Sequence, residues 1–261
     1  MISNLAYVDP SAQLGKDVII EPFATVYGDV VIGDGTWIGP SSTIFDGARI
    51  GRNCKVFPGA TVSAIPQDLK FSGEMTTAEI GDNTTIREGV TVNRGTVALG
   101  KTIVGNNCLL MANSHVAHDC IVGDNCILVN NVGLAGEVVL GDWVILGGGA
   151  AVHQFTHIGA HAMISGGTML RKDVPPYVII NHNPVGYMGI NSVGLTRRGF
   201  TKDQIDGIHN IYRAIYQSKM NTSQAVEHIR STFEATPERD AILDFIASSE
   251  RGIIKSAVGV Y

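Results

Sequence analysis

Polar residues whose types could support chemistry gather near the middle of the chain. His115, His118 and Asp119 are close neighbours in the sequence. Gly136 and Gln154 follow His118 at two equal intervals. An imidazole suits proton transfer because its pKa lies near neutral pH, and a glycine leaves its backbone amide unobstructed. These residues can form one site only if the fold places positions separated by this interval next to one another.

A six-residue repeat predicts such a fold. Every sixth residue from Ile2 to Leu170 is Ile, Leu or Val, except Asp68, Glu74 and Ala98. A period of six fits neither a helix nor an ordinary strand. It fits short strands wound into a coil, each with one aliphatic side chain pointing inward and often with a glycine in the turn that follows. We therefore predict a coil with three faces, in which each turn uses three successive repeats.

In this coil, residues three repeats apart lie above one another, separated by about 4.8 Å per turn. His118 then lies below Gly136 and Gln154, with Glu137 and His153 alongside. A single histidine beside an inward position is more often an ordinary turn residue. Several histidines that converge near a glycine are more than turn preferences supply, so we predict a functional site at this corner of the coil.

Composition excludes several classes of protein. The chain has 261 residues, of which 44% are hydrophobic and 16% charged, which is typical of a globular protein. A net charge of −5 argues against general nucleic-acid binding. We expect neither a secretory signal nor a membrane-spanning segment. The four cysteines form no CxxC pair, and each follows an inward position by four residues, which favours reduced core thiols in a cytoplasmic protein.

The repeat divides the chain into two parts. It ends at Leu170, and two prolines that cannot donate to a strand ladder follow soon after. Helices are expected from about residue 200, with N-caps at Thr201, Ser223 and Thr236. The predicted domains are a β-helix over residues 1–185, with an inserted loop at about 67–79, and a helical domain over residues 186–261. A loop of this length in a regular coil favours a functional role.

Several motifs carry a resemblance to a known family. They are Gln67-Asp68-Leu69-Lys70, His115 to Cys120, Val152-His153-Gln154-Phe155, Asp173 to Tyr177 and Gly194 to Phe200. Together with the repeat, they resemble the UDP-N-acetylglucosamine O-acyltransferases, which are hexapeptide-repeat acyltransferases. The resemblance implies a mainly β fold, a left-handed parallel β-helix that assembles as a homotrimer. It also implies transfer of an (R)-3-hydroxyacyl group from acyl carrier protein to the 3-hydroxyl of UDP-N-acetylglucosamine, the first step of lipid A biosynthesis, without a cofactor or metal.

The resemblance also implies roles for individual residues. His118 is the expected general base, Asp119 supports it, and the Gly136 amide stabilises the oxyanion. Asp119 and Gly136 could instead be ordinary turn residues. The residues expected to bind the sugar nucleotide are Gln67, Asp68, Lys70, His115, His153, Gln154, Asn191, Arg197 and Arg198.

Some of these binding residues have simpler explanations. Lys70 could be a solvated charge, and Arg197 and Arg198 could hold the helical domain or face an acidic carrier protein. The sequence also departs from the family pattern at two positions. The family often has histidine where this chain has Glu137, and it commonly has glutamate where this chain has Val193.

Three other functions fit parts of the sequence. An acyltransferase of the same fold could act on a 3-amino or other UDP-amino sugar. A γ-type carbonic anhydrase binds a metal through three histidines between subunits, and His153, His157 and His161 suggest this alternative. However, these three residues are expected on both sides of one turn and near the next, where they do not converge. A non-catalytic scaffold leaves the inserted loop and the clustered histidines without a role.

Overall fold

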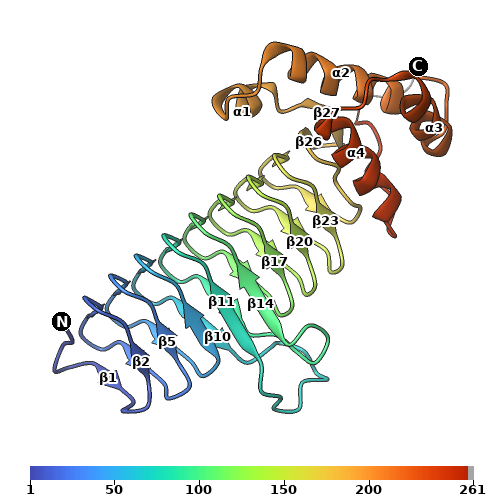
Figure 1. The fold of residues 1–261 in the computed structure, drawn as a ribbon. Coiled ribbons are helices and arrows are strands. Elements are labelled where there is room, and N and C mark those ends of the chain that lie inside the picture. Colours follow the sequence, from blue (N-terminus) through green and yellow to red (C-terminus); the bar gives the residue numbers. More distant parts are fainter. Residues whose placement is uncertain (258–261) are drawn as a thin grey trace.

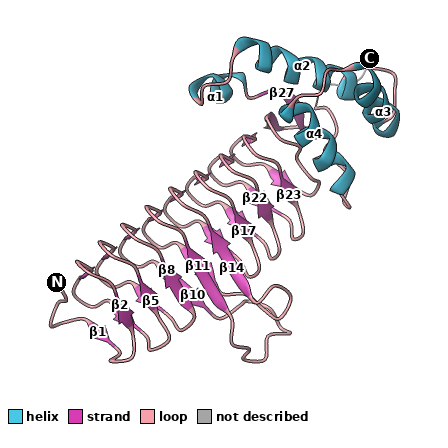
Figure 2. Ribbon diagram, viewed as in Figure 1, coloured by secondary structure: helices cyan, strands magenta, loops and turns pink. Residues whose placement is uncertain are grey.

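The computed structural model describes residues 1–257. The chain winds through three sheets of short strands that form a long three-sided prism, and helices cover one end of it (Figures 1 and 2). The prediction of a mainly β protein, with a left-handed parallel β-helix and a small helical region near its C-terminal end, is confirmed. None of the helices in the described part of the chain has the length and apolar character needed to span a membrane.

Each sheet forms one face of the prism. The first face consists of β1 (Tyr7–Val8), β4 (Thr25–Val26), β7 (Thr43–Ile44), β10 (Thr61–Ala64), β13 (Thr91–Asn93), β16 (His115–Val116), β19 (Gly133–Leu134), β22 (Ala151–Val152) and β25 (Met169–Leu170). The second face consists of β2 (Gln13–Leu14), β5 (Val31–Ile32), β8 (Ala48–Ile50), β11 (Thr77–Ile80), β14 (Lys101–Val104), β17 (Ile121–Val122), β20 (Val139–Leu140) and β23 (His157–Ile158). The third face consists of β3 (Ile19–Ile20), β6 (Trp37–Ile38), β9 (Lys55–Val56), β12 (Thr85–Ile86), β15 (Leu109–Leu110), β18 (Ile127–Leu128), β21 (Ile145–Leu146), β24 (Met163–Ile164), β26 (Val178–His182) and β27 (Val185–Ile190).

Two edges of the prism matter for the site. The turns that lead from the first face to the second form the first corner, which includes residues 117–120 and 135–138. The turns that lead from the second face to the third form the second corner, which includes residues 141–144 and 159–162. The second face therefore separates the two corners within one chain.

The inward residues of successive coils form one core. Val116 pairs with Leu134, and Leu134 pairs with Val152, so strands three repeats apart are neighbours, as the sequence predicts. All three side chains are buried. Burial of each such aliphatic side chain contributes about 1.5–3 kcal/mol, which explains why the sequence keeps Ile, Leu or Val at these positions. The cysteines are free and buried, as expected of core thiols.

Two loops interrupt the coil. Ile80 pairs with Ile50, five repeats earlier in the sequence, and Val104 pairs with Ile80, four repeats earlier, where a regular turn uses three. The first loop spans residues 65–76, so the predicted loop at 67–79 extended too far, because 77–79 belong to β11. The second loop, residues 94–100, was not predicted. Both insertions lengthen the sequence by whole repeats, which keeps the period in phase, so that the break at Ala98 is the only irregularity of the repeat within the second loop.

The C-terminal part adds strands as well as helices. The strands β26 and β27 form an antiparallel hairpin on the third face, and the predicted boundary at residues 185/186 falls inside β27, between its first two residues. The helices are α1 (Ser192–Arg197), α2 (Lys202–Tyr216), α3 (Thr222–Thr232) and α4 (Pro237–Ser248). Thr201 and Thr236 are N-caps as predicted. The prediction for Ser223 is wrong, because the Asn221 side chain accepts the capping hydrogen bond from the Gln224 amide.

Candidate active site

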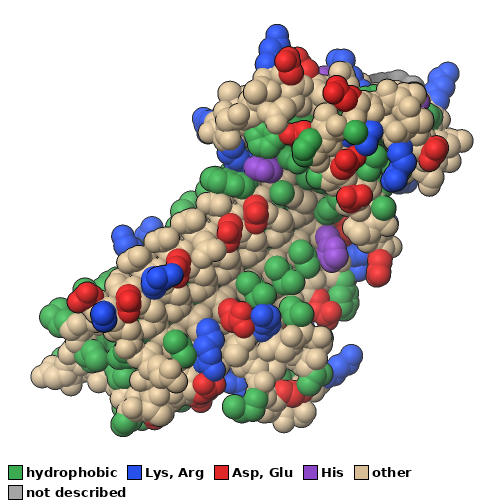
Figure 3. Space-filling model, viewed as in Figure 1, with side chains coloured by type: hydrophobic (Ala, Val, Ile, Leu, Met, Phe, Trp, Pro, Cys, Tyr) green, Lys and Arg blue, Asp and Glu red, His purple; other side chains and the backbone are tan. Residues whose placement is uncertain are grey.

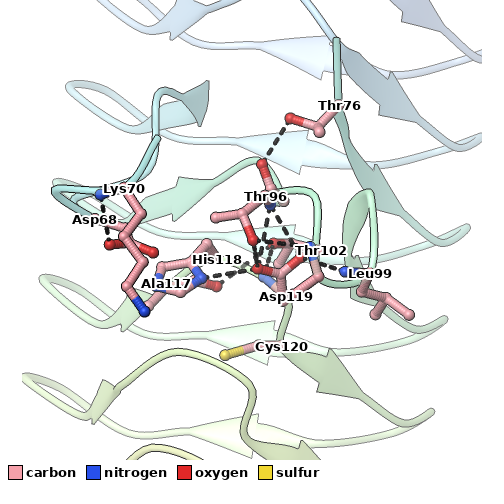
Figure 4. A network of polar contacts seen from close by, with 12 residues as sticks. Asp68, Lys70, Thr76, Thr96, Leu99, Thr102, Ala117, His118, Asp119 and Cys120 are labelled. Atoms are coloured by element: carbon pink, nitrogen blue, oxygen red, sulfur yellow. Dashed lines mark hydrogen bonds and ion pairs between the residues drawn. The ribbon is translucent and has the colours of Figure 1, made fainter. Parts of the chain in front are cut away.

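The first corner holds a histidine and a carboxylate in direct contact. His118 Nδ1 lies 2.8 Å from Asp119 Oδ2 (Figure 4). The His118 side chain is 17% exposed, whereas that of Asp119 is fully buried. The carboxylate accepts hydrogen bonds from the Thr96 amide and hydroxyl at 2.9 and 2.7 Å, and from the Leu99 amide at 3.2 Å. The loop 94–100, which sequence reasoning missed, therefore anchors the Asp119 side chain.

These contacts fix the charge on Asp119 and the tautomer of His118. Burial alone raises the pKa of Asp119, but the hydrogen bonds from Thr96, His118 and Leu99 outweigh it and hold the pKa below its ordinary value. An ionised carboxylate can only accept, so the proton in the His118–Asp119 contact belongs to Nδ1. The Nε2 atom of His118 then carries a free lone pair and can take up a proton.

Gly136 lies directly against the His118 ring. An added Cβ at this position would lie 2.5 Å from Cε1 and 2.6 Å from Nε2 of His118. The Gly136 amide makes no hydrogen bond within residues 1–257. Any side chain here would displace the imidazole, so the glycine does more than allow a turn. The corner places a free N–H donor and a proton acceptor side by side.

An open groove of about 450 Å³ brings many of the predicted residues together. It is lined by Gln67, His115, His118, Gly136 and Gln154, among others. His115 Nδ1 lies 2.7 Å from the Thr91 hydroxyl, and burial and the nearby His118 lower the pKa of His115. The imidazole of His115 is therefore neutral and can share hydrogen bonds in the groove.

Three further predicted residues are Asp68 and Lys70 of the loop 65–76 and His153 of the first corner. The loop 65–76 brings Asp68 and Lys70 to the side of His118 (Figure 4), and Asp68 Oδ1 accepts a hydrogen bond from the Lys70 amide. His153 is exposed and contacts Arg251, with its Nδ1 3.4 Å from Arg251 Nη2.

Glu137 lies outside the groove. It lines a separate cavity of about 520 Å³ on the second face, together with Val139, His157 and Arg251. Hydrophobic side chains gather between the loops and the helical region on the face seen in Figure 3. Glu137, one of the two positions at which the sequence departs from the family pattern, is therefore not part of the groove that holds His118.

Three of the predicted residues lie away from the groove. Asn191 Nδ2 donates to the His161 carbonyl at 2.9 Å, and Arg198 Nη1 lies 3.2 Å from His161 Nδ1. Arg197 is the exposed last residue of α1. His161 belongs to the second corner, so these residues are separated from His118 by the second face. The spacing of the repeat predicted that His118, Gly136 and Gln154 lie together. It could not assign Asn191, Arg197 and Arg198 to a corner.

The histidines of the carbonic anhydrase alternative also lie apart. His153 belongs to the first corner, His157 to the second face and His161 to the second corner. Among the residues that the structure describes, no cluster of three His, Cys, Asp or Glu side chains is placed to hold a metal ion.

The residues that support the His118–Asp119 pair were not predicted. Besides Thr96 and Leu99, they include Thr102, whose hydroxyl oxygen accepts a hydrogen bond from the Asp119 amide at 2.8 Å. Asp119 has a φ of 58°, a left-handed conformation that aspartate tolerates better than most residues. The break of the repeat at Ala98 is the one sequence signal of the loop that supplies Thr96.

Comparison with known proteins covers both parts of the chain. A family model described as UDP-N-acetylglucosamine O-acyltransferase, domain 2, matches residues 173–254. A model for bacterial transferase hexapeptide repeats matches residues 11–46, 29–64 and 101–136. The acyl-[acyl-carrier-protein]–UDP-N-acetylglucosamine O-acyltransferase of Myxococcus xanthus is 45% identical over 196 residues, which is 75% of this chain and 76% of that protein.

Solved structures give the same result. The UDP-N-acetylglucosamine acyltransferase of Bacteroides fragilis is 51% identical, with a TM-score of 0.96 over 98% of this chain and 100% of the other. The LpxA structure from Acinetobacter baumannii is 42% identical, with a TM-score of 0.94 over 97% of this chain and 99% of the other. Since these likenesses extend over the coil, the loops and the helices, the chain is an acyltransferase that belongs to the acyl-[acyl-carrier-protein]–UDP-N-acetylglucosamine O-acyltransferase family.

Proposed function

We propose that this protein transfers an (R)-3-hydroxyacyl group from acyl carrier protein to the 3-hydroxyl of UDP-N-acetylglucosamine, the first step of lipid A biosynthesis. The relative from Myxococcus xanthus is named for this donor and this acceptor. The observation that carries the proposal is the contact of His118 with the buried Asp119 carboxylate and with Gly136 at an open groove. These groups match what acyl transfer to a hydroxyl requires.

In the proposed mechanism, His118 Nε2 takes the proton from the sugar 3-hydroxyl as its oxygen attacks the thioester carbonyl. The Asp119 carboxylate stabilises the imidazolium that forms. The Gly136 N–H donates to the oxyanion of the tetrahedral intermediate. Collapse of this intermediate breaks the carbon–sulfur bond, and the imidazolium returns its proton to the thiolate of the carrier protein. The catalytic residues are then His118, Asp119 and Gly136.

The sugar nucleotide binds along the groove in this proposal. Gln67, Asp68 and Lys70 of the loop 65–76 and His115 of β16 contact the sugar and its phosphates. Gln154, one coil above Gly136, completes this side of the site. The neutral His115 fits a hydrogen-bonding role.

We infer that a homotrimer completes the site. Asn191, Arg197 and Arg198 would bind the nucleotide and diphosphate, and guanidinium groups suit phosphate oxygens. Because Asn191 and Arg198 are held at the second corner, a neighbouring copy would have to bring them to the groove at the first corner. His153, which already lies at the first corner, would contact the sugar nucleotide from there. We also infer a cytoplasmic location, because the four cysteines are free and buried.

The test is turnover with purified protein, UDP-N-acetylglucosamine and a panel of 3-hydroxyacyl carrier proteins, with product detected by mass spectrometry. We expect His118→Ala to lower kcat by about 10³, within the range for loss of a general base. His157→Ala, which removes an exposed histidine of the second face, is the matched control and should remain active.

Each other outcome is informative. Turnover that survives in His118→Ala would keep the reaction and reject His118 as the base. Turnover only with the 3-amino analogue of the sugar nucleotide would assign the protein to the amino-sugar alternative. Absence of transfer to either acceptor would reject the proposed function.

A further inference from the structure

One column of turn residues at the second corner changes its composition part of the way along the prism. The third residue after each inward position has a left-handed backbone conformation in coil after coil. In four successive coils this residue is asparagine, with φ between 53° and 58°: Asn53, Asn83, Asn107 and Asn125. Asparagine tolerates this conformation better than most residues. The next three members of the column are Trp143, His161 and Tyr177, with φ of 63°, 63° and 68°.

Bulky aromatic residues rarely adopt this conformation. The contacts of the three rings must therefore offset the conformational energy that the positive φ costs. Their rings are stacked along the prism. The Trp143 and His161 rings have centroids 6.4 Å apart at an interplanar angle of 6°, and those of His161 and Tyr177 are 5.5 Å apart at 17°. Phe200 meets the His161 ring edge-on, with centroids 5.2 Å apart. The column becomes aromatic in the coils next to the helical region, which contributes Phe200 to the contact with His161.

The aromatic column holds Arg198. The guanidinium carbon lies 5.1 Å from the centroid of the Trp143 ring, within reach of a cation–π interaction. Arg198 Nη1 lies 3.2 Å from His161 Nδ1. Because a guanidinium has no acceptor, His161 Nδ1 must be the acceptor and the imidazole must be neutral. Burial and the charge of Arg198 lower the pKa of His161 to about 4, which is consistent with that state.

The same column also holds Asn191 through its backbone. The Asn191 amide N–H donates to the Tyr177 carbonyl at 2.7 Å, and Asn191 Nδ2 donates to the His161 carbonyl at 2.9 Å. Two residues of the proposed nucleotide site are thus fixed by neighbouring members of one column. Their common support is the turn of the β-helix and not α1 alone.

We propose that Trp143, His161 and Tyr177 are positioning residues that orient Arg198 and Asn191 toward the diphosphate of the sugar nucleotide, an inference that rests on the proposed function. The aromatic rings replace asparagine at these turns because they fix the guanidinium plane. Arg198 then meets the diphosphate already oriented, which favours binding of the sugar nucleotide without a direct part in acyl transfer.

The decisive variant is Trp143→Asn, because it restores the residue that the earlier coils use and removes only the ring. We expect the KM for UDP-N-acetylglucosamine to rise about tenfold, with kcat and the KM for the acyl carrier protein changed less than about twofold. Trp143→Phe keeps a ring beneath the guanidinium and should recover most of the affinity. His161→Asn, a second variant suited to the same conformation, should also raise this KM.

A double-mutant cycle with Arg198→Ala separates positioning from packing. If Trp143 acts through Arg198, the Trp143→Asn change should have almost no further effect in the Arg198→Ala background. Additive effects, or an unchanged KM in an active Trp143→Asn protein, would overturn the inference and leave the proposed function intact. If the wild type shows no turnover, calorimetric binding of UDP-N-acetylglucosamine to the same variants gives the same comparison. A wild type that neither acylates nor binds this nucleotide would reject both proposals.

Discussion

The two corners of the prism use the same side chain in opposite ways. At the first corner, His118 contacts a buried carboxylate and faces an open groove. At the second corner, His161 is packed between aromatic rings and accepts a hydrogen bond from an arginine. The Asp119 carboxylate accepts from Nδ1 of His118 and leaves Nε2 as the free acceptor, whereas Arg198 donates to Nδ1 of His161. The first histidine is therefore suited to proton transfer and the second to holding a cation in place.

The support of each histidine comes from a departure from the regular coil. Asp119 is anchored by Thr96 and Leu99 of the inserted loop 94–100. Arg198, which holds His161 neutral, comes from the helical region beyond the coil. The coil supplies the positions of the imidazoles, and the added segments determine what they can do.

The largest effect on activity is expected from Gly136→Ala, which tests the arrangement of the first corner. The added Cβ would lie 2.5 Å from Cε1 of His118, so the imidazole must move out of its position against the Asp119 carboxylate. We expect kcat to fall by about 10² to 10³, as when an oxyanion donor or a catalytic contact is lost. Gly207→Ala, where an added Cβ meets no atom within 4 Å, is the control and should keep its activity. Full activity of Gly136→Ala would show that the close contact is not needed.

Next in size is Asp119→Asn, which keeps the shape but removes the charge beside His118. We expect kcat to fall by about 10- to 100-fold, because the imidazolium loses a hydrogen bond to a charged partner, worth about 1.5–3 kcal/mol. Asp124→Asn serves as the control, since the Asp124 carboxylate accepts from the Asn106 amide in a turn away from His118. Equal activity of the two variants would support the reading of Asp119 as an ordinary turn residue.

A smaller effect is expected from Thr96→Val, which removes one donor to Asp119 at 2.7 Å. The carboxylate keeps its other hydrogen bonds, so we expect a fewfold loss of kcat and a loss of about 1–3 kcal/mol in the free energy of unfolding. Thr84→Val removes a hydroxyl that is also buried but donates to the Gly105 carbonyl. That control should lose stability without losing kcat. A loss of kcat in both variants would mean that activity follows stability alone.

The last prediction concerns no loss of activity, only the dependence of stability on pH that comes from His161. Its pKa lies at about 4, below the ordinary value of 6.5, because of burial and Arg198, with Asp142 acting in the opposite direction. The unfolded chain therefore binds a proton first, so the folded state loses stability as the pH falls from about 6.5 toward 4. We expect His161→Asn to lose less stability than the wild type over this range in urea unfolding. A parallel loss in both proteins would contradict the description of the second corner.

The sequence predicted the coil, its core and most of the first corner, because the six-residue repeat fixes which residues lie above one another. It gave only one sign of the loop 94–100, the break of the repeat at Ala98, since the insertion of one whole repeat leaves the period in phase. It also could not place Asn191 and Arg198 at the second corner, because those contacts depend on how the helical region returns to the coil. The capping error at Ser223 arose because Asn221, two positions earlier, is an equally good cap.

The two inserted loops also have a consequence for how such a protein changes over evolutionary time. Each loop leaves the coil and returns to a strand that pairs with the coil beneath it, so every downstream inward residue keeps its orientation. The number of residues inside such a loop does not change this pairing, because the coil beneath sets the register of the strands that follow. Loops can therefore be gained, lost or exchanged, and a lineage can alter what surrounds its active site without having to rebuild the scaffold beneath it.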